Sequence, residues 1–344
     1  MKEVTPDPLF PGSGMIAWMA PAPLDRPYRG SRVDRPRGVP LPPERLPLLR
    51  AGQLRKDWRY VSFWSRKLSF CAARADVGPL RKEYWGIWDR TSRQFRQGAH
   101  LFTRRVRLEP DRVYVRDEDA EIDVTFEDCD GFEVYRPADH AYIWSRKGYC
   151  REARGFVRYG DTERVVAGVI FVDINAGYHE RRTHWRWAAG AGRDQRGRLV
   201  AFNAIIGLHD HPERSERTIW VNGEEREIGP VTFSDDLSAV SFAEGGTLQF
   251  RPEALIEQHT NLLLVCSDYL HWFRRLHRNP ARWNRAGRSP WSPRTPRRPV
   301  VGVRIVHYLR ILYWWLPGVG EEAFVDFALS ADAMLSGHVS LRAH

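Results

Sequence analysis

The sequence has few of the features that mark secreted or membrane-spanning proteins. Only four of its 344 residues are cysteine, and no two of them form a C-x-x-C pair. This scatter fits neither a disulfide framework nor a zinc-binding pattern, so we expect free thiols in the reducing environment of the cytoplasm. No run of about 18 uncharged apolar residues occurs, and we therefore expect no membrane-spanning helix.

Familiar catalytic signatures are also missing. The chain contains no G-x-G-x-x-G, no P-loop and no G-x-S-x-G sequence. These motifs bind dinucleotides, bind nucleotide phosphates or place a nucleophilic serine. Their absence disfavours nucleotide-dependent chemistry and serine hydrolysis, and we expect no cofactor.

The formal net charge of +10 is carried by the two ends of the chain. Residues 274–344 contain 12 Lys and Arg against 4 Asp and Glu, and residues 1–50 contain 8 against 5, so the body between them is close to neutral. A nucleic-acid-binding protein concentrates basic residues on its folded part. We therefore expect no nucleic-acid partner, and the sequence carries no signal for an oligomeric state.

From Trp58 onward, short runs with aromatic and β-branched residues at every second position recur between Gly, Pro and Asp turns. Period two with these residue types is typical of half-buried strands. The pattern predicts an all-β, antiparallel protein, either a sandwich or a barrel assembly. Asn222-Gly223 and Gly131 mark hairpin turns. The clearest runs are WRYVSFW (58–64), EYWGIWD (83–89), EIDVTFE (121–127), AYIWSR (141–146), RVVAGVIFVD (164–173), THWRWAAG (183–190), LVAFNAIIGL (199–208) and NLLLVCSD (261–268).

Composition divides the chain into four segments. Residues 1–50 are rich in Pro and Arg without a hydrophobic period, and we expect a largely disordered arm. We expect an N-terminal β domain at 51–162 and a C-terminal β domain at 163–273. Residues 274–344 lose the strand period and are dense in Arg, Pro and Trp.

The most informative segment is FVDINAGYHERRTHWRWAAGAG, at 171–192. We expect one strand to end at Asp173, a glycine-containing turn to follow, and a second strand to carry Trp185 and Trp187 on one face. Asp173, His179 and Arg182 lie around the turn. A carboxylate, an imidazole and a guanidinium there can form a charge-assisted network.

This segment resembles the bacterial family known as domain of unknown function 2804, which shows a strand ending in Asp, then A-G-Y-H, then R-x-T-x-W-x-W. The resemblance covers roughly residues 54–273. Where the family often has Asp and Ser, this chain has Ile174 and Asn175. The matching residues are Asp173, Ala176, Gly177, Tyr178, His179, Arg182, Thr183, Trp185 and Trp187, together with LRKDWRYV (54–61), YIWSRK (142–147), SERTIWVNG (215–223), PVTFSDDLS (230–238) and NLLLVCSDY (261–269).

The family is similar in architecture to the carotenoid 1,2-hydratase and lipocalin-like group, which builds two open β-barrels around apolar ligands. The resemblance implies two lipocalin-like open barrels, with a large β-sandwich as the alternative. It implies no specific ligand, because one fold hosts many functions.

Residues 274–344 do not continue the family's pattern, in which a G-x-F-x-G segment, a Pro-Gly-Gly turn and a terminal H-D-x-R-W follow. GC-rich codons for this segment, read one base later, can encode that ending, and Trp283 then forces a glycine codon. We therefore hypothesise a frameshift near Phe273–Arg275, which implies that the family's C-terminal strands are missing. The alternative is a natural basic tail with a C-terminal helix at residues 303–315.

Asp173 and His179 are the first candidates for catalysis, because a carboxyl group and an imidazole can act as acid and base. Tyr178 and Arg182 are then expected to orient a ligand or stabilise charge. The alternative is a structural turn, in which Asp173 caps backbone amides, Arg182 pairs with it and Tyr178 packs in the core.

The candidate ligand-binding residues are aromatic side chains and one lysine. Trp144 and Lys147 lie beside Tyr142, and Trp185 and Trp187 follow the turn. A lysine after aromatic residues can sit in a pocket, although a lysine at a strand end is more often in solvent.

His209 and His211 form an H-x-H sequence that can direct two imidazoles to a metal. No third ligand is evident, so a polar loop is the preferred interpretation and we expect no metal. Two strand-terminal polar pairs are expected at the same mouth as the candidate residues, namely Glu216-Arg217 and Asp268-Tyr269.

Two functions of different classes follow. In the first, a tryptophan-lined cavity (Trp64, Trp85, Trp144, Trp185, Trp187) binds a lipid- or isoprenoid-like molecule. In the second, the protein is a lyase or hydratase that uses Asp173 and His179. A pocket that brings both side chains to one void favours the enzyme, and mutual burial without a cavity favours binding or structure. A third hypothesis is an inactive copy, truncated by the frameshift.

Overall fold

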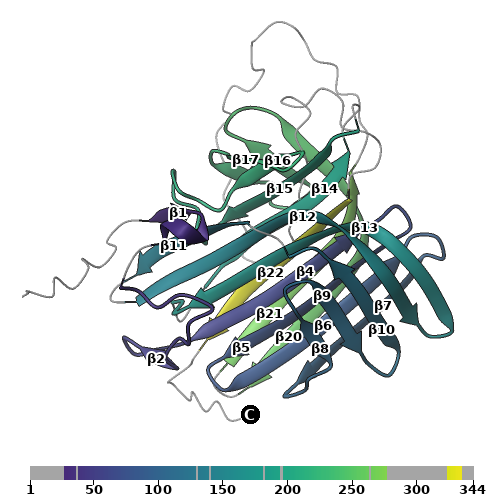
Figure 1. The fold of residues 1–344 in the computed structure, drawn as a ribbon, viewed down its shortest axis with the longest axis horizontal. Coiled ribbons are helices and arrows are strands. Elements are labelled where there is room, and N and C mark those ends of the chain that lie inside the picture. Colours follow the sequence, from purple (N-terminus) through teal and green to yellow (C-terminus); the bar gives the residue numbers. More distant parts are fainter. Residues whose placement is uncertain are drawn as a thin grey trace, which may run out of the picture.

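The computed structural model describes residues 27–35, 38–128, 131–138, 141–180, 183–193, 197–262, 265–276 and 324–334 (Figure 1). Within these ranges nearly all regular structure is antiparallel β-strand, and the one helical segment is the 3₁₀ turn η1 (Arg32–Asp34). The all-β, antiparallel fold predicted from the period-two pattern is therefore confirmed. In these ranges no helix has the length and apolar character to cross a membrane.

The first sheet has eleven strands, in the order β7-β6-β5-β4-β13-β12-β10-β9-β8, and β11 pairs with both β12 and β1. A small hairpin, β2 (Leu49–Arg50) with β3 (Gln53–Leu54), stands apart. The strands of the first sheet are β1 (Tyr28–Gly30), β4 (Lys56–Trp64), β5 (Leu68–Val77), β6 (Leu80–Asp89), β7 (Gln94–Leu101), β8 (Val106–Leu108), β9 (Arg112–Arg116), β10 (Ala120–Phe126), β11 (Gly131–Ala138), β12 (Ala141–Tyr159) and β13 (Thr162–Gly177).

The second sheet has nine strands, in the order β17-β16-β15-β14-β22-β21-β20-β19-β18. Its strands β14 to β17 lie together at the top of Figure 1. The strands are β14 (Trp185–Arg193), β15 (Leu199–Ile206), β16 (Thr218–Val221), β17 (Glu224–Glu227), β18 (Val231–Phe233), β19 (Ala239–Phe242), β20 (Thr247–Leu262), β21 (Val265–Leu276) and β22 (Phe324–Met334).

One strand comes from the segment in which the sequence predicted none. β22 lies between β14 and β21 and pairs antiparallel with both, so residues 324–334 fill a central position of the second sheet. Its sequence, FVDFALSADAM, has a short period-two alternation through Val325, Phe327 and Leu329 that the arginine-rich stretch before it obscures. The frameshift itself stays a hypothesis, and most of residues 274–344 lie outside the described residues.

The first sheet curls into a half-barrel because its end strand β8 folds back over β4, β5 and β6. The curl is filled by one face of these strands and by the inward residues of β9, β10, β12 and β13. Because successive side chains of a strand point to opposite faces of the sheet, every second residue of each strand faces the inside of the curl. Residues from six strands that fill the curl include Val61, Phe63, Phe70, Ile87, Val115, Ile122 and Ile170.

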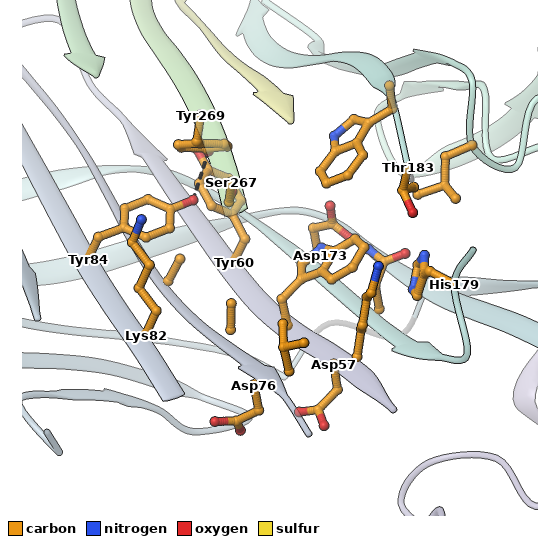
Figure 2. Close-up of a pocket in the computed structure, with 18 of the residues that line it drawn as sticks. Asp57, Tyr60, Asp76, Lys82, Tyr84, Asp173, His179, Thr183, Ser267 and Tyr269 are labelled. Atoms are coloured by element: carbon orange, nitrogen blue, oxygen red, sulfur yellow. Dashed lines mark hydrogen bonds between the residues drawn. The ribbon is translucent and has the colours of Figure 1, made fainter. Parts of the chain in front are cut away.

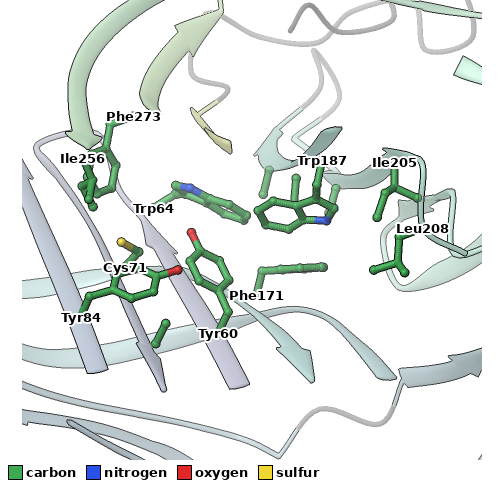
Figure 3. Close-up of a cluster of buried hydrophobic side chains, with 14 of the residues drawn as sticks. Tyr60, Trp64, Cys71, Tyr84, Phe171, Trp187, Ile205, Leu208, Ile256 and Phe273 are labelled. Atoms are coloured by element: carbon green, nitrogen blue, oxygen red, sulfur yellow. The ribbon is translucent and has the colours of Figure 1, made fainter. Parts of the chain in front are cut away.

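The opposite face of β4, β5 and β6 packs against the second sheet (Figure 3). Tyr60 and Phe171 of the first sheet meet Trp187, Ile205 and Phe273 of the second in one buried cluster. This interface joins the two sheets into one core, and the candidate site lies within it.

Gly86 on β6 allows the two sheets to approach closely. A Cβ atom at this position would lie 2.5 Å from Ile256 Cδ1 and 3.3 Å from Phe273 Cε2, both on the second sheet. Only a residue without a side chain fits here without displacing those groups.

Residues 38–50 pack along the end of β12 and β13. The Tyr178 hydroxyl donates to the Pro47 carbonyl at 2.8 Å, and the Tyr142 hydroxyl donates to the Pro40 carbonyl. Arg35 pairs with Glu133 at 2.6 Å. The expected division of the chain after residue 162 stays a prediction, and the strand that begins at Thr162 belongs to the first sheet.

Candidate functional site

A cavity of about 170 Å³ lies between the facing surfaces of the two sheets (Figure 2). Most of its wall is apolar, and it is built from both sheets. The first sheet supplies Trp58, Tyr60, Ala73, Ala75, Val77 and Tyr84, and the second sheet with its connections supplies Trp185, Trp187, Ile205, Leu208 and Tyr269.

Strand register places the central charged pair of this cavity. Asp173 on β13 lies opposite Lys147 on β12 and opposite Tyr60 on β4. Because side chains of directly paired residues point to the same side of a sheet, all three face the second sheet. Lys147 Nζ lies 2.6 Å from Asp173 Oδ1, and both side chains are buried.

A second carboxylate reaches Lys147 from the other half of the molecule. Glu216, just before β16, places Oε1 3.0 Å from Lys147 Nζ and accepts a hydrogen bond from Ser145 Oγ at 2.8 Å through Oε2. Lys147, Asp173 and Glu216 are all buried, with 1%, 6% and 0% of their surface exposed. Two buried carboxyl groups therefore share one ammonium group.

The electrostatics of this cluster favour retention of a proton. Burial raises the pKa of both Asp173 and Glu216, and Lys147 opposes that rise. Burial alone would lower the pKa of Lys147, but the two carboxylates raise it. Since a single ammonium cannot neutralise two carboxylates, one carboxyl group is favoured as the neutral acid. The cluster thus offers a proton donor beside an apolar space.

Two amides extend the polar cluster. Asn175 Nδ2 donates to Asp173 Oδ1 at 2.7 Å, and Asn175 Oδ1 has no partner within the described residues. Asn203 accepts from Trp187 Nε1 at 2.6 Å and donates to the Glu216 carbonyl at 2.7 Å. Hydrogen bonds thus hold Trp187 and Glu216 in place, whereas the Asn175 oxygen remains available.

His179 follows β13 and lies in the cavity wall with 2% of its surface exposed. Neither of its ring nitrogens has a hydrogen-bond partner within the described residues. Its ring centroid is 4.9 Å from that of Trp58, which stacks on Trp185 at 5.5 Å. Burial, and then the charge of Lys56, lowers the pKa of His179 to about 3, so the imidazole is neutral near pH 7.

Two further lysines line the cavity. Lys56, at the start of β4, donates to the Glu180 carbonyl at 3.0 Å. Lys82, on β6, donates to Thr260 Oγ1 at 2.7 Å and lies near the hydrogen-bonded pair Tyr84 and Tyr269 (Figure 2). Burial lowers the pKa of each lysine to about 8.

The structure separates the sequence-predicted site residues into two groups. Asp173, His179, Lys147, Trp185 and Trp187 line one cavity. A different buried cluster contains Tyr142, Trp144 and Tyr178, which packs beneath residues 38–50 and does not line the cavity. Arg182 lies outside the described residues.

The predicted tryptophan lining is met only in part. Of the five tryptophans named, Trp185 and Trp187 line the cavity, while Trp64 and Trp85 pack in the two large hydrophobic clusters. Trp144 donates to Glu133 Oε2 at 3.1 Å. Trp58 is a wall residue that the sequence analysis did not single out, although its period-two spacing from Tyr60 places both on one face.

The H-x-H sequence separates its two imidazoles. His209 is buried and neither ring nitrogen has a partner among the described residues, whereas His211 Nδ1 contacts the Glu213 carbonyl near the surface. In the part of the chain that the structure describes, no group of three or more His, Cys, Asp or Glu side chains is arranged to hold a metal. Of the strand-terminal pairs, Glu216 and Tyr269 line the cavity.

Comparison with protein families gives one match. The model of the family described as "Domain of unknown function (DUF2804)" matches residues 89–273, which is more than half of the chain. The comparison with curated proteins gives no match.

Solved structures with a related chain path share little sequence. A Nitrosomonas europaea protein provisionally designated AttH has 11% identity and a TM-score of 0.44, with 85% of this chain and 98% of that chain covered. Kievitone hydratase from Nectria haematococca has 8% identity and a TM-score of 0.43, with coverage of 81% and 89%. CghA in complex with Sch210972 has 10% identity and a TM-score of 0.31, with coverage of 83% and 89%.

Proposed function

This chain belongs to the family described as domain of unknown function 2804, and we propose that it binds an apolar small molecule in the cavity between its two sheets. The observation that carries the proposal is the wall itself. Aromatic and aliphatic side chains provide most of the wall surface, and the polar and charged lining residues contribute only a small part of it. Such a composition is typical of sites that bind apolar ligands and orient them by a small number of polar contacts.

The size of the cavity limits the part of the ligand that it encloses. An engineered cavity of about 150 Å³ in another protein binds benzene. At about 170 Å³, the present cavity encloses one ring or a short isoprenoid unit, and a longer lipid would have to extend beyond it. Small terpenoid or aromatic molecules are therefore favoured over long-chain lipids.

Binding is testable with the tryptophans of the wall. Titration with p-cymene or geraniol should change the fluorescence of Trp58, Trp185 and Trp187, and calorimetry should give a saturable isotherm. The variant Ala75→Leu should weaken binding at least tenfold, because residue 75 lies between Trp58 and Lys82 on the cavity side. The control Val165→Leu, on the exposed surface, should bind as the native protein does. Equal binding by all three proteins would place the ligand elsewhere.

Acid–base chemistry of the lyase or hydratase type is the second candidate. Asp173 and His179 line the same cavity, and the ring nitrogens of His179 have no hydrogen-bond partner within the described residues. A neutral imidazole can accept a proton, and the carboxyl pair around Lys147 can supply one. The arrangement would serve addition or removal of water at an apolar carbon skeleton.

Recovery of the ligand distinguishes binding from catalysis. A bound molecule that is recovered with its mass unchanged supports a binding protein. Gain or loss of one water, detected by mass spectrometry, supports the enzyme. In that case Asp173→Asn and His179→Gln should abolish conversion while the fluorescence titration still shows binding. Conversion that survives both substitutions would exclude these two residues as acid and base.

The hypothesis of an inactive, frameshifted copy depends on the DNA and not on the site. Sequencing of the gene around codons 270–280 tests it, because one reading frame without a gained or lost base would refute it. The described part of the tail supports the second sheet through β22. Any restored chain should therefore be compared with the present one in the same binding titration.

A further inference from the structure

One end of the cavity contains the buried ammonium group of Lys56, which forms no ion pair within the described residues. Lys56 has 6% of its surface exposed, and its Nζ donates to the carbonyl of Glu180 at 3.0 Å. That carbonyl also accepts the Thr183 hydroxyl, at 3.0 Å. Within the described ranges Lys56 has no carboxylate partner, although an ammonium has three protons to donate.

The imidazole of His179 lies close to this ammonium group. His179 is in the same wall, and its two ring nitrogens lack partners in the part of the chain that the structure describes. The positive charge of Lys56 lowers the pKa of His179 and so helps to keep the imidazole neutral. A neutral imidazole still carries one N–H donor. Buried donors that remain unsatisfied are costly, so these two groups mark a place where an acceptor is missing.

All but one of the remaining charged groups named in the wall form ion pairs. Lys147 pairs with Asp173 and Glu216, Asp57 pairs with Arg55 at 2.9 Å, and Asp76 pairs with Arg81 at 2.7 Å. Lys82 also lacks a carboxylate among the described residues, but it is only half-buried and donates to Thr260. Of the two cavity lysines that form no ion pair within the described residues, Lys56 is therefore the more deeply buried.

We propose that Lys56 and His179 form an anion subsite, and that the ligand is an apolar molecule that ends in a carboxylate. The inference rests on the proposed binding function and names its ligand class. A carboxylate would accept hydrogen bonds from the Lys56 ammonium and from the His179 N–H. Its single negative charge matches the one positive charge of Lys56, whereas a phosphate dianion would leave excess charge in an apolar space.

The apolar part of such a ligand would pack against Trp58 and Trp185, which lie next to His179. Trp58 contacts His179 and stacks on Trp185, with ring planes only 4° apart. These two indoles form a flat wall next to the subsite. A carboxylate at Lys56 would thus direct an attached ring or short chain along the tryptophans and into the rest of the cavity.

The test compares an acid with its neutral counterpart. 3-Phenylpropanoate and 3-phenylpropanamide have nearly the same shape, and both are titrated at pH 6.5 by calorimetry and tryptophan fluorescence. The native protein should bind the acid at least tenfold more tightly than the amide. Lys56→Met should remove that preference and leave amide binding within about twofold, and His179→Phe should reduce the preference.

Lys82→Met is the matched control. It removes a lysine with a similarly lowered pKa from another part of the same wall, and the acid should keep its preference. A preference that is lost equally in Lys56→Met and Lys82→Met would show a general effect of positive charge and overturn the subsite. Lys56→Gln repeats the test with a polar side chain, and circular dichroism confirms that each variant is folded.

The outcomes separate this inference from the proposed function. If p-cymene binds but the native protein does not prefer the acid, the cavity binds ligands and the anion subsite is wrong. If neither p-cymene nor the acid binds, the proposed function fails and the subsite with it. A covalent adduct with a carbonyl compound at Lys56, trapped by borohydride, would also overturn the subsite, because the lysine would then act as a neutral nucleophile.

Discussion

Replacing Lys56 with methionine is expected to stabilise the fold at neutral pH, although the substitution removes a hydrogen bond. Lys56 is buried, and its one acceptor within the described residues is the Glu180 carbonyl. Burial lowers its pKa from 10.5 to about 8. A lowered pKa for a lysine means that the folded state disfavours the charged form, so the ammonium reduces stability wherever it is charged.

The expected change in the free energy of unfolding follows from the pKa shift of Lys56. A shift from 10.5 to about 8 corresponds to about 3 kcal/mol at pH values below the folded pKa, at about 1.4 kcal/mol per unit. Loss of the hydrogen bond to Glu180 costs about 1 kcal/mol. Lys56→Met should therefore raise the free energy of unfolding at pH 7 by about 2 kcal/mol.

The pH dependence provides the stronger check. As pH rises from 8 to 10.5, the unfolded lysine keeps its proton while the folded one has lost it, so the native protein gains stability with pH. Methionine does not titrate, so its advantage should shrink across this window and become a loss of about 1 kcal/mol above it, where only the missing hydrogen bond counts. The neighbouring imidazole of His179 has a pKa of about 3 and stays neutral over this range.

Urea denaturation at several pH values between 6 and 10.5 measures the difference. The control Lys67→Met removes an exposed lysine and should change stability by less than about 0.5 kcal/mol at every pH. The reasoning is refuted if Lys56→Met destabilises the protein at pH 7, or if its effect does not change with pH. Either result would mean that the Lys56 charge is compensated in the folded protein.

Three further predictions concern the core and the buried charges. Lys147→Met should destabilise the protein by about 3–5 kcal/mol, because Asp173 and Glu216 lose the ammonium group that they share. Adding Asp173→Asn and Glu216→Gln should restore most of the loss in urea denaturation. Gly86→Ala should cost about 1–3 kcal/mol through the contact with Ile256 Cδ1, and the double variant with Ile256→Val should lose less than the sum of the two single changes. His179 has a folded pKa of about 3, so the unfolded chain takes up its proton first as pH falls below 6.5. Stability should then decline by about 1.4 kcal/mol per pH unit for this residue, and His179→Phe should show a correspondingly shallower slope between pH 6 and 4.

The sequence predicted a strand well where aromatic and β-branched residues alternate clearly with polar ones along its length. The run at 58–64 became β4 (Lys56–Trp64), and the run at 83–89 became part of β6 (Leu80–Asp89). The run at 141–146 fell short of β12, which continues to Tyr159. In that extension Glu152, Arg154 and Arg158 are exposed, while Ala153, Val157 and Tyr159 are buried, so a charged face masks the strand.

Candidate residues close together in the sequence were predictable, since Asp173 and His179 lie six positions apart around one turn and reach the same cavity. Tyr178 and Trp144 illustrate the limit of that reasoning. They carry suitable chemistry, but the strand pleat turns them toward residues 38–50 and away from the cavity.

By itself, the sequence determined the strand type, the turns and the existence of a polar cluster at Asp173, because these depend on local periodicity and on residue chemistry. Only the tertiary structure decided which charges meet. Lys147 reaches Asp173 through the register of β12 with β13, and Glu216 reaches Lys147 from the second sheet. A shift of one residue in that register would turn the partners to opposite faces. No local pattern specifies such long-range pairing, since it is set by the packing of the two sheets.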